Sequence, residues 1–96
     1  MNKIFVSLPV NGEDYVDQRN HAFVVATNLA QKGYEVITQF DVEKSVTTPF
    51  NETIANHIEA MLECDGIYLC RGWSDSKVCQ AVLQVALIYK KSVMTE

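Results

Sequence analysis

Short apolar runs alternate along the chain with longer segments whose apolar residues recur at helical spacing. Residues 3–9 form an apolar run rich in β-forming side chains, which predicts a first strand. Residues 13–32 carry apolar side chains at helical spacing with acids in the first turns, and Gly33 closes this predicted helix. A second strand is expected over residues 34–38, and a loop over residues 39–50.

The second half of the chain repeats this alternation. Asn51 is expected to cap a second helix, whose apolar residues fall at positions i, i+4, i+7 and i+8. A turn at residues 64–66 then leads into a third strand over residues 67–70. Ser74 or Asp75 is expected to cap a third helix that runs to about residue 89.

A short last strand is expected over residues 92–94, so strands and helices alternate throughout. This order is typical of a parallel sheet with right-handed crossovers. We therefore expect residues 1–96 to form a single α/β domain, a small three-layer flavodoxin-like or Rossmann-like sheet with strand order 2-1-3-4. In that order the first helix covers one face of the sheet, and the second and third helices share the other.

Strand order reverses between strands one and three, and ligands of such sheets bind beyond the carboxyl ends of these strands. Trp73 offers a ring for stacking, and Arg71 with nearby backbone N–H groups suits a phosphate. The alternative is that Trp73 packs on a neighbour and Ser74 only caps a helix. Two loops follow these strands, residues 7–12 and residues 71–76. They supply the candidate ligand-binding residues: Ser7, Pro9 and Asn11 from the first loop, and Arg71, Gly72, Trp73, Ser74 and Ser76 from the second.

Other motifs that would indicate a particular chemistry are missing from the sequence. Neither a dinucleotide-binding glycine fingerprint nor a P-loop occurs. His21 and His57 fall on predicted helices without a second metal ligand at suitable spacing, so we expect no metal site and no cofactor. Ser7 and Cys70 end the strands where a receiver domain needs acids, and no nucleophile-elbow motif supports a serine triad.

Charge and composition limit the partners of the domain. The net charge is −4 with a pI near 5.0 and no basic stripe, which disfavours a nucleic acid polymer. No apolar run approaches the length of a membrane span. The three cysteines lack Cys-x-x-Cys spacing and indicate reduced thiols in a cytoplasmic protein. The third predicted helix is apolar nearly all round, so we expect a homodimer or a higher homo-oligomer.

A resemblance to a known family rests on three segments of the chain, residues 3–9, 33–37 and 61–77. Together they resemble the nucleoside 2-deoxyribosyltransferase-like superfamily, in particular its short bacterial and phage branch, most of whose members have no assigned activity. The most specific part is Cys-Asp-x-Ile-Tyr-Leu followed by Gly-Trp-x-x-Ser, within residues 64–77. The chain is also similar, more weakly, to the first part of TIR domains, but it lacks the later sequence motifs of that fold.

The resemblance implies a nucleophilic glutamate on the helix after this loop, which forms a covalent glycosyl intermediate in active members. In this chain Val82 stands at that position, and His57 stands where the branch has an acid on the preceding helix. The resemblance therefore implies a nucleoside- or nucleotide-binding domain without glycosyl transfer, and it assigns no catalytic residue. The alternative is an active deoxyribosyltransferase or N-glycosidase with a relocated carboxylate, for which the candidates are Glu59, Glu63 and Asp75.

Overall fold

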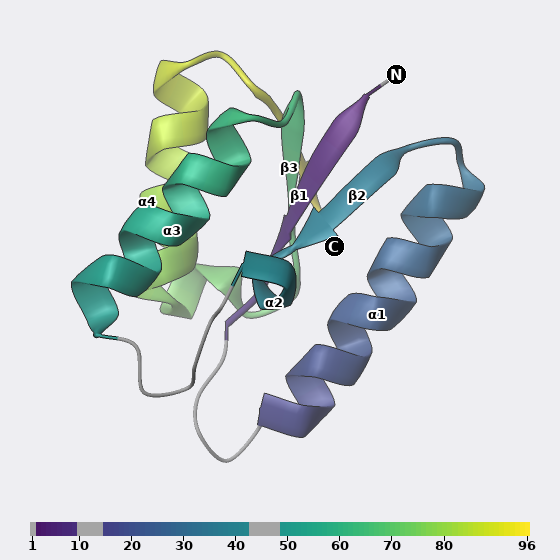
Figure 1. Cartoon of the computed structure of the whole chain (residues 1–96), viewed down its shortest axis with the longest axis horizontal. Coiled ribbons are helices and arrows are strands. Elements are labelled where there is room, and N and C mark those ends of the chain that lie inside the picture. The colour runs from purple at the N-terminus through teal and green to yellow at the C-terminus, as the bar shows by residue number, and fades with distance from the viewer. Residues whose placement is uncertain (1, 10–14, 43–48) are drawn as a thin grey trace.

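A four-stranded parallel sheet forms the centre of the computed structural model, which describes residues 2–9, 15–42 and 49–96 (Figure 1). The strands are β1 (Lys3–Ser7), β2 (Glu35–Thr38), β3 (Gly66–Leu69) and β4 (Ser92–Thr95). They pair in the order β2-β1-β3-β4, and every pairing is parallel. The fold is therefore flavodoxin-like α/β, and the predicted class and strand order are confirmed.

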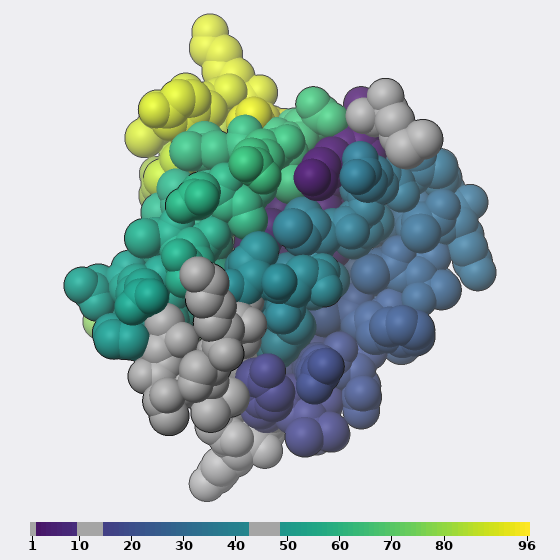
Figure 2. Space-filling model, in the orientation of Figure 1, coloured from purple at the N-terminus to yellow at the C-terminus, as the bar shows by residue number. Residues whose placement is uncertain are grey.

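Helices cover the sheet from both sides, as Figure 1 shows. Helix α1 lies alone on one face, whereas α3 and α4 lie side by side on the other, in agreement with the expected division. Figure 2 shows the surface of β2 and α2 between these two layers. The helices are α1 (Tyr15–Gln31), α2 (Gln39–Val42), α3 (Phe50–Leu62) and α4 (Lys77–Ile88), with a 3-10 turn, η2 (Trp73–Asp75), before α4.

Helix α2 corrects the prediction that residues 39–50 are all loop. Its first residue, Gln39, is buried, and its Oε1 accepts a hydrogen bond of 2.8 Å from the backbone N–H of Leu8. Asp41 closes the turn locally, since its Oδ2 accepts from the backbone N–H of Thr38 at 2.7 Å. This single helical turn therefore depends on a contact with the end of β1 that sequence periodicity does not encode.

The predicted helix caps are also wrong in their positions. Helix α3 begins at Phe50 after Pro49, so Asn51 lies inside the helix rather than at its cap. Residues 73–75 form the 3-10 turn, and Ser76 is the residue that caps α4. The Oγ of Ser76 accepts from the backbone N–H of Cys79 at 3.2 Å. The extra turn moves the start of α4 beyond both predicted caps.

Strand β1 divides its side chains between two apolar clusters, one on each face of the sheet. Successive residues of a strand point to opposite faces, so Ile4 and Val6 pack towards α1 while Phe5 packs towards α3 and α4. The cluster on the α1 side is Ile4, Val6, Leu8, Ala22, Val25, Leu29 and Cys70. The cluster on the other side is Phe5, Ala60, Met61, Cys64, Ile67, Leu69, Cys79, Val82 and Ala86.

Several large apolar side chains stay on the surface. Val16, Phe23 and Val24 lie along α1, and Phe23 is 73% exposed. Ile88 at the end of α4 is 72% exposed, and most of β4 is exposed as well. None of the helices in the described part of the chain has the length and apolar character needed to cross a membrane.

Candidate functional site

Backbone hydrogen bonds hold the segments at the carboxyl edge of the sheet in place. The N–H of Cys70 donates to the carbonyl of Ser7 at 2.9 Å, which ties the residue after β3 to the end of β1. The N–H of Glu96 donates to the carbonyl of Leu69, also at 2.9 Å, and ties the residue after β4 to the end of β3. The side chains that follow three parallel strands therefore start from fixed backbone positions.

The loop after β3 turns sharply at Gly72 and contacts the loop after β1. Gly72 has a φ of +90°, a left-handed conformation that favours glycine. A Cβ at this position would lie 3.1 Å from Cγ of Pro9, so the two loops touch here. The N–H of Trp73 then donates to the carbonyl of Cys70 at 3.1 Å and closes the turn. The two predicted ligand-binding loops are thus neighbours in the fold.

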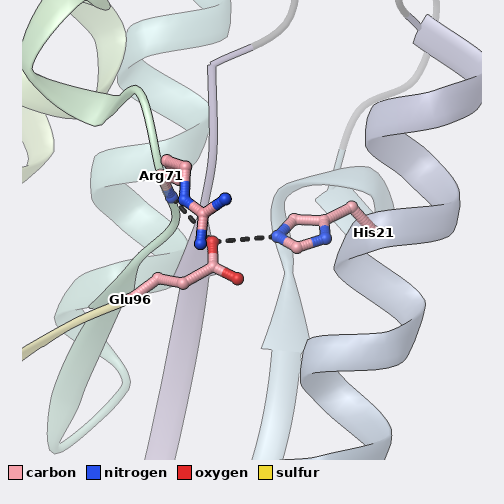
Figure 3. Close-up of polar contacts among 3 residues, drawn as sticks. All are labelled: His21, Arg71 and Glu96. Carbon is pink, nitrogen blue, oxygen red and sulfur yellow. Dashed lines mark hydrogen bonds and ion pairs between the residues drawn. The ribbon is translucent and has the colours of Figure 1, made fainter.

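A polar cluster lies beside this turn and joins three elements that are far apart in the sequence. The carboxylate of Glu96 lies between His21 of α1 and Arg71 of the loop after β3 (Figure 3). Its Oε1 accepts from the backbone N–H of Arg71 at 2.8 Å and lies 2.9 Å from Nε2 of His21. Since an ionised carboxylate only accepts, His21 carries a proton on Nε2 in this contact.

These partners keep the Glu96 carboxyl group ionised. Burial alone would raise the pKa of Glu96, but the hydrogen bonds from the Arg71 backbone and from His21, with the positive charges of both residues, outweigh it and lower the pKa. The thiol of Cys70, next in sequence to Arg71, behaves in the opposite way. Burial, with smaller contributions from Glu96 and Cys79, raises the pKa of Cys70 to about 12.

A hollow of about 290 Å³ opens on this cluster. Its wall consists of Asp17, Gln18 and His21 from one face of α1, together with Arg71 and Glu96 from the carboxyl edge. The lining offers both donors and carboxylate acceptors, with one fixed cation at Arg71. Such a lining suits a small polar ligand that carries an anionic group and several hydroxyl or amide groups.

The predicted ligand-binding residues take different positions around this edge. Arg71 lines the hollow, whereas the Ser7 hydroxyl is fully buried and donates to Sγ of Cys79 at 3.3 Å. Trp73 is half-buried and packs against the apolar cluster beneath α4, while Ser74 is exposed. Ser76 uses its hydroxyl to cap α4, as described above, and is half-buried. Asn11 lies outside the residues that the structure describes.

Sequence reasoning missed two residues of this cluster, His21 and Glu96. The sequence predicts His21 to be a solvated or edge-of-core residue of the first helix, and it assigns Glu96 no role. One available signal was positional, since Glu96 follows the last parallel strand and must emerge at the same edge as the residue after β3. His21 carries no such signal, because its place depends on how α1 crosses the sheet.

Val82 and His57, the two positions at which the resemblance leads one to expect acids, both lie in the interior. Val82 is fully buried in the apolar cluster between the sheet and α3 and α4. His57 is 1% exposed, and its ring lies 6.0 Å from that of Phe5, measured between centroids. Neither residue lines the hollow that contains Glu96. The polar groups of the described site therefore belong to α1 and the strand ends rather than to α4.

Comparison with known proteins adds a family but no activity. None of the curated proteins matches this chain. The model of one family, described as a domain of unknown function (DUF4406), matches residues 2–95. This match covers all four strands of the sheet and the described helices, including the loop that carries Arg71. The chain therefore belongs to the DUF4406 family.

Proposed function

We propose that this domain binds a nucleoside or nucleotide at the carboxyl edge of its sheet and does not transfer the glycosyl group. The observation that carries the proposal is the hollow at this edge, lined by Arg71, His21 and Glu96. Its volume of about 290 Å³ is near the lower end of the range of ligand pockets, which begins at about 300 Å³. A ligand of nucleoside size, partly exposed to solvent, is therefore a reasonable occupant.

The chemistry of the lining supports the same ligand class. The Arg71 guanidinium suits a phosphate, and the Glu96 carboxylate suits sugar hydroxyls or the amino groups of a base. The resemblance of residues 64–77 to the nucleoside 2-deoxyribosyltransferase-like superfamily is a second support. Val82 supports the absence of glycosyl transfer, since its fully buried position leaves no carboxylate where the resemblance expects the nucleophile.

A panel of deoxynucleosides and their monophosphates tests the proposal by two measurements on the same samples. Binding is followed by chemical shift changes, and release of free base is followed by chromatography. We expect binding without base release, with shifts at His21, Arg71 and Glu96. Shifts confined to the exposed face of α1 around Phe23, or no binding to any member of the panel at millimolar concentration, would contradict the placement of the site.

Arg71→Ala should weaken the binding of monophosphates more than the binding of nucleosides, because only a monophosphate has a phosphate group for the guanidinium to contact. Arg19→Ala is the matched control, since Arg19 is an exposed cation of α1 that does not line the hollow. Trp73 packs against the apolar cluster and does not line the hollow, so Trp73→Ala should weaken the binding of both ligand classes alike, through the loop that carries Arg71. Equal losses of monophosphate affinity in Arg71→Ala and Arg19→Ala would mean that the effect comes from the overall charge of the domain and not from a contact with Arg71.

One observation favours the alternative of an active N-glycosidase or transferase. Glu96 presents an ionised carboxylate to the hollow, and its lowered pKa keeps it available as a nucleophile. If base is released, Glu96→Gln should abolish that release while the protein stays folded. Glu59→Gln is the control, because Glu59 is an exposed residue of α3. Release that survives Glu96→Gln would exclude this carboxylate as the relocated acid.

A further inference from the structure

Three potential metal ligands of different types meet behind the hollow. Nε2 of His21, Sγ of Cys70 and a carboxylate oxygen of Glu96 all lie within 4.8 Å of one another. They come from α1, from the residue after β3 and from the residue after β4, so no spacing in the sequence announces them. The sequence alone predicts no metal site, because neither histidine has a second potential metal ligand at suitable spacing along the chain.

We propose that His21, Cys70 and Glu96 bind a zinc ion. Imidazole nitrogen, thiolate sulfur and carboxylate oxygen are the three ligand types of zinc sites in proteins, and three protein ligands with one open position is the usual arrangement of a reactive zinc. Zinc bonds of about 2.0–2.3 Å in a tetrahedron place ligand atoms roughly 3.5 Å apart. The distances between the three ligand atoms, at most 4.8 Å, therefore need to shorten by about 1.3 Å at most, within the reach of side-chain rotation.

The surroundings fix two of the three ligands in advance. Cys70 is fully buried in the apolar cluster on the α1 side of the sheet, and its backbone N–H donates to the carbonyl of Ser7, so this ligand starts from a fixed backbone position. Glu96 is oriented by the backbone N–H of Arg71, the kind of outer hydrogen bond that positions metal ligands. The side chain of His21 is 40% exposed, and its contact is with Glu96, the hydrogen bond that the metal would replace. The open coordination position then faces the hollow.

The charges and protons of the binding step balance. The Cys70 thiol loses its proton on binding zinc, and the thiolate and the Glu96 carboxylate together neutralise the two positive charges of the ion. The protonated ring of His21 loses its Nε2 proton and keeps the one on Nδ1, so that Nε2 can donate its lone pair to the metal. The ion thus replaces the hydrogen bond between His21 and Glu96, and two protons pass to solvent, one from Cys70 and one from His21.

The competing interpretation is that His21 and Glu96 form an ordinary surface ion pair above a core cysteine. That interpretation predicts no stoichiometric metal binding and no role for the Cys70 sulfur. It also differs from the zinc site in its response to Arg71→Ala. This substitution keeps the backbone N–H that orients Glu96 but removes a positive charge beside the site, so zinc should bind more tightly. The same substitution should weaken a nucleotide, so the two proposals fail separately.

Titration of the full chain with Zn²⁺ against a coloured chelator, and with Co²⁺ by absorption spectroscopy, tests the site. We expect one ion per chain and a thiolate-to-cobalt charge-transfer band, together with a rise in the melting temperature on adding Zn²⁺. Cys70→Ser should abolish the band, and His21→Gln and Glu96→Gln should each weaken zinc at least about tenfold, the lower end of the loss seen for outer-shell partners. His21 is on the surface, so His21→Gln tests the site even if Cys70→Ser fails to fold.

Cys64→Ser is the matched control for the sulfur. Cys64 is also buried and free, and a serine hydroxyl can still donate to the carbonyl of Ala60 as the thiol does. The control should keep both the stoichiometry and the cobalt band. Absence of stoichiometric binding at micromolar zinc would overturn the proposal, as would equal zinc affinity for the wild type and His21→Gln. Loss of the band in Cys64→Ser with its retention in Cys70→Ser would overturn it too.

Discussion

Placing a glutamate at residue 82 tests whether this position belongs to the core or to a ligand crevice. Val82 is fully buried among Phe5, Cys79 and the other members of the α3–α4 cluster. If the position is core, Val82→Glu must place a carboxyl group in an apolar surrounding that disfavours the charged form. If the side chain instead reaches the carboxyl edge, the substitution restores the nucleophile that the superfamily resemblance implies.

The cost of the charge follows from the pKa that such a carboxyl group acquires. A buried glutamate can reach a pKa of about 8–9, against about 4.3 in the unfolded chain. At pH 7 the group is then protonated when folded and ionised when unfolded, which costs about 3.7 kcal/mol, since each pH unit above 4.3 contributes about 1.36 kcal/mol. At pH 5 the same reasoning leaves about 1 kcal/mol.

The sign of the pH dependence follows from the proton count. Between about pH 4.3 and the folded pKa, the unfolded state binds fewer protons than the folded state, so the free energy of unfolding falls as the pH rises. Val82→Gln carries a side chain of the same size without the charge. It therefore shares the overpacking cost of about 1–3 kcal/mol and isolates the contribution of the carboxyl group.

Urea unfolding of both variants at pH 5 and pH 7 measures this difference. Trp73 is the only tryptophan of the chain and packs against the same cluster, so its fluorescence reports the unfolding of this face. We expect Val82→Glu to be less stable than Val82→Gln by about 3.7 kcal/mol at pH 7 and by about 1 kcal/mol at pH 5. A gap that is small and equal at both pH values would mean that the carboxylate is solvated, and would refute a core position.

Four further outcomes are expected. Gly66→Ala should lower the free energy of unfolding in urea by about 1–3 kcal/mol, because its Cβ would lie 2.8 Å from a backbone oxygen of β4. Glu96→Gln should lower the free energy of unfolding at neutral pH but not in acid. The lowered pKa of Glu96 gives a stabilising contribution that is present above pH 4.5 and is lost as the pH falls through the pKa of the folded state. Unfolding of both proteins across the acid range measures this, and the stability of the wild type should fall more steeply with decreasing pH. The metal-free protein should react with a disulfide reagent only after unfolding, because all three cysteines are buried and the pKa of Cys70 is raised to about 12; a fast native reaction would contradict this. Sedimentation at micromolar concentration should show association, weakened by Phe23→Ser or Ile88→Ser, since both side chains are more than 70% exposed, and a mass of 10.8 kDa would contradict it.

The sheet was predictable because its information is local and redundant. Residues 3–7 alternate between two apolar faces, and each strand is separated from the next by a segment with helical spacing, which leaves few possible topologies. The turns were less predictable because they depend on contacts between distant segments. Helix α2 needs the bond from Leu8 to Gln39, and the start of α4 at Lys77 depends on the 3-10 turn that follows Gly72.

The candidate site was only half predictable for the same reason. Arg71 could be placed at the carboxyl edge, since it follows a strand that ends at the switch point of the sheet. The burial of the Ser7 hydroxyl could not be predicted, because it depends on Cys79 of α4 lying beneath the end of β1. The grouping of His21 with Glu96 joins residues that are 75 positions apart, a distance at which sequence spacing carries no information about contact.

Arg71 is the residue at which the ligand proposal and the zinc proposal separate. Its guanidinium attracts a phosphate and repels a cation, while its backbone N–H orients Glu96 in either case. If both proposals hold, a phosphate oxygen entering the hollow fills the open coordination position, and zinc and nucleotide then strengthen each other's binding by the same factor. His21→Gln should in that case weaken the nucleotide only when zinc is present. A loss of nucleotide affinity in His21→Gln without zinc would instead mean that His21 contacts the nucleotide directly, while Glu96 accepts a hydrogen bond from the His21 ring.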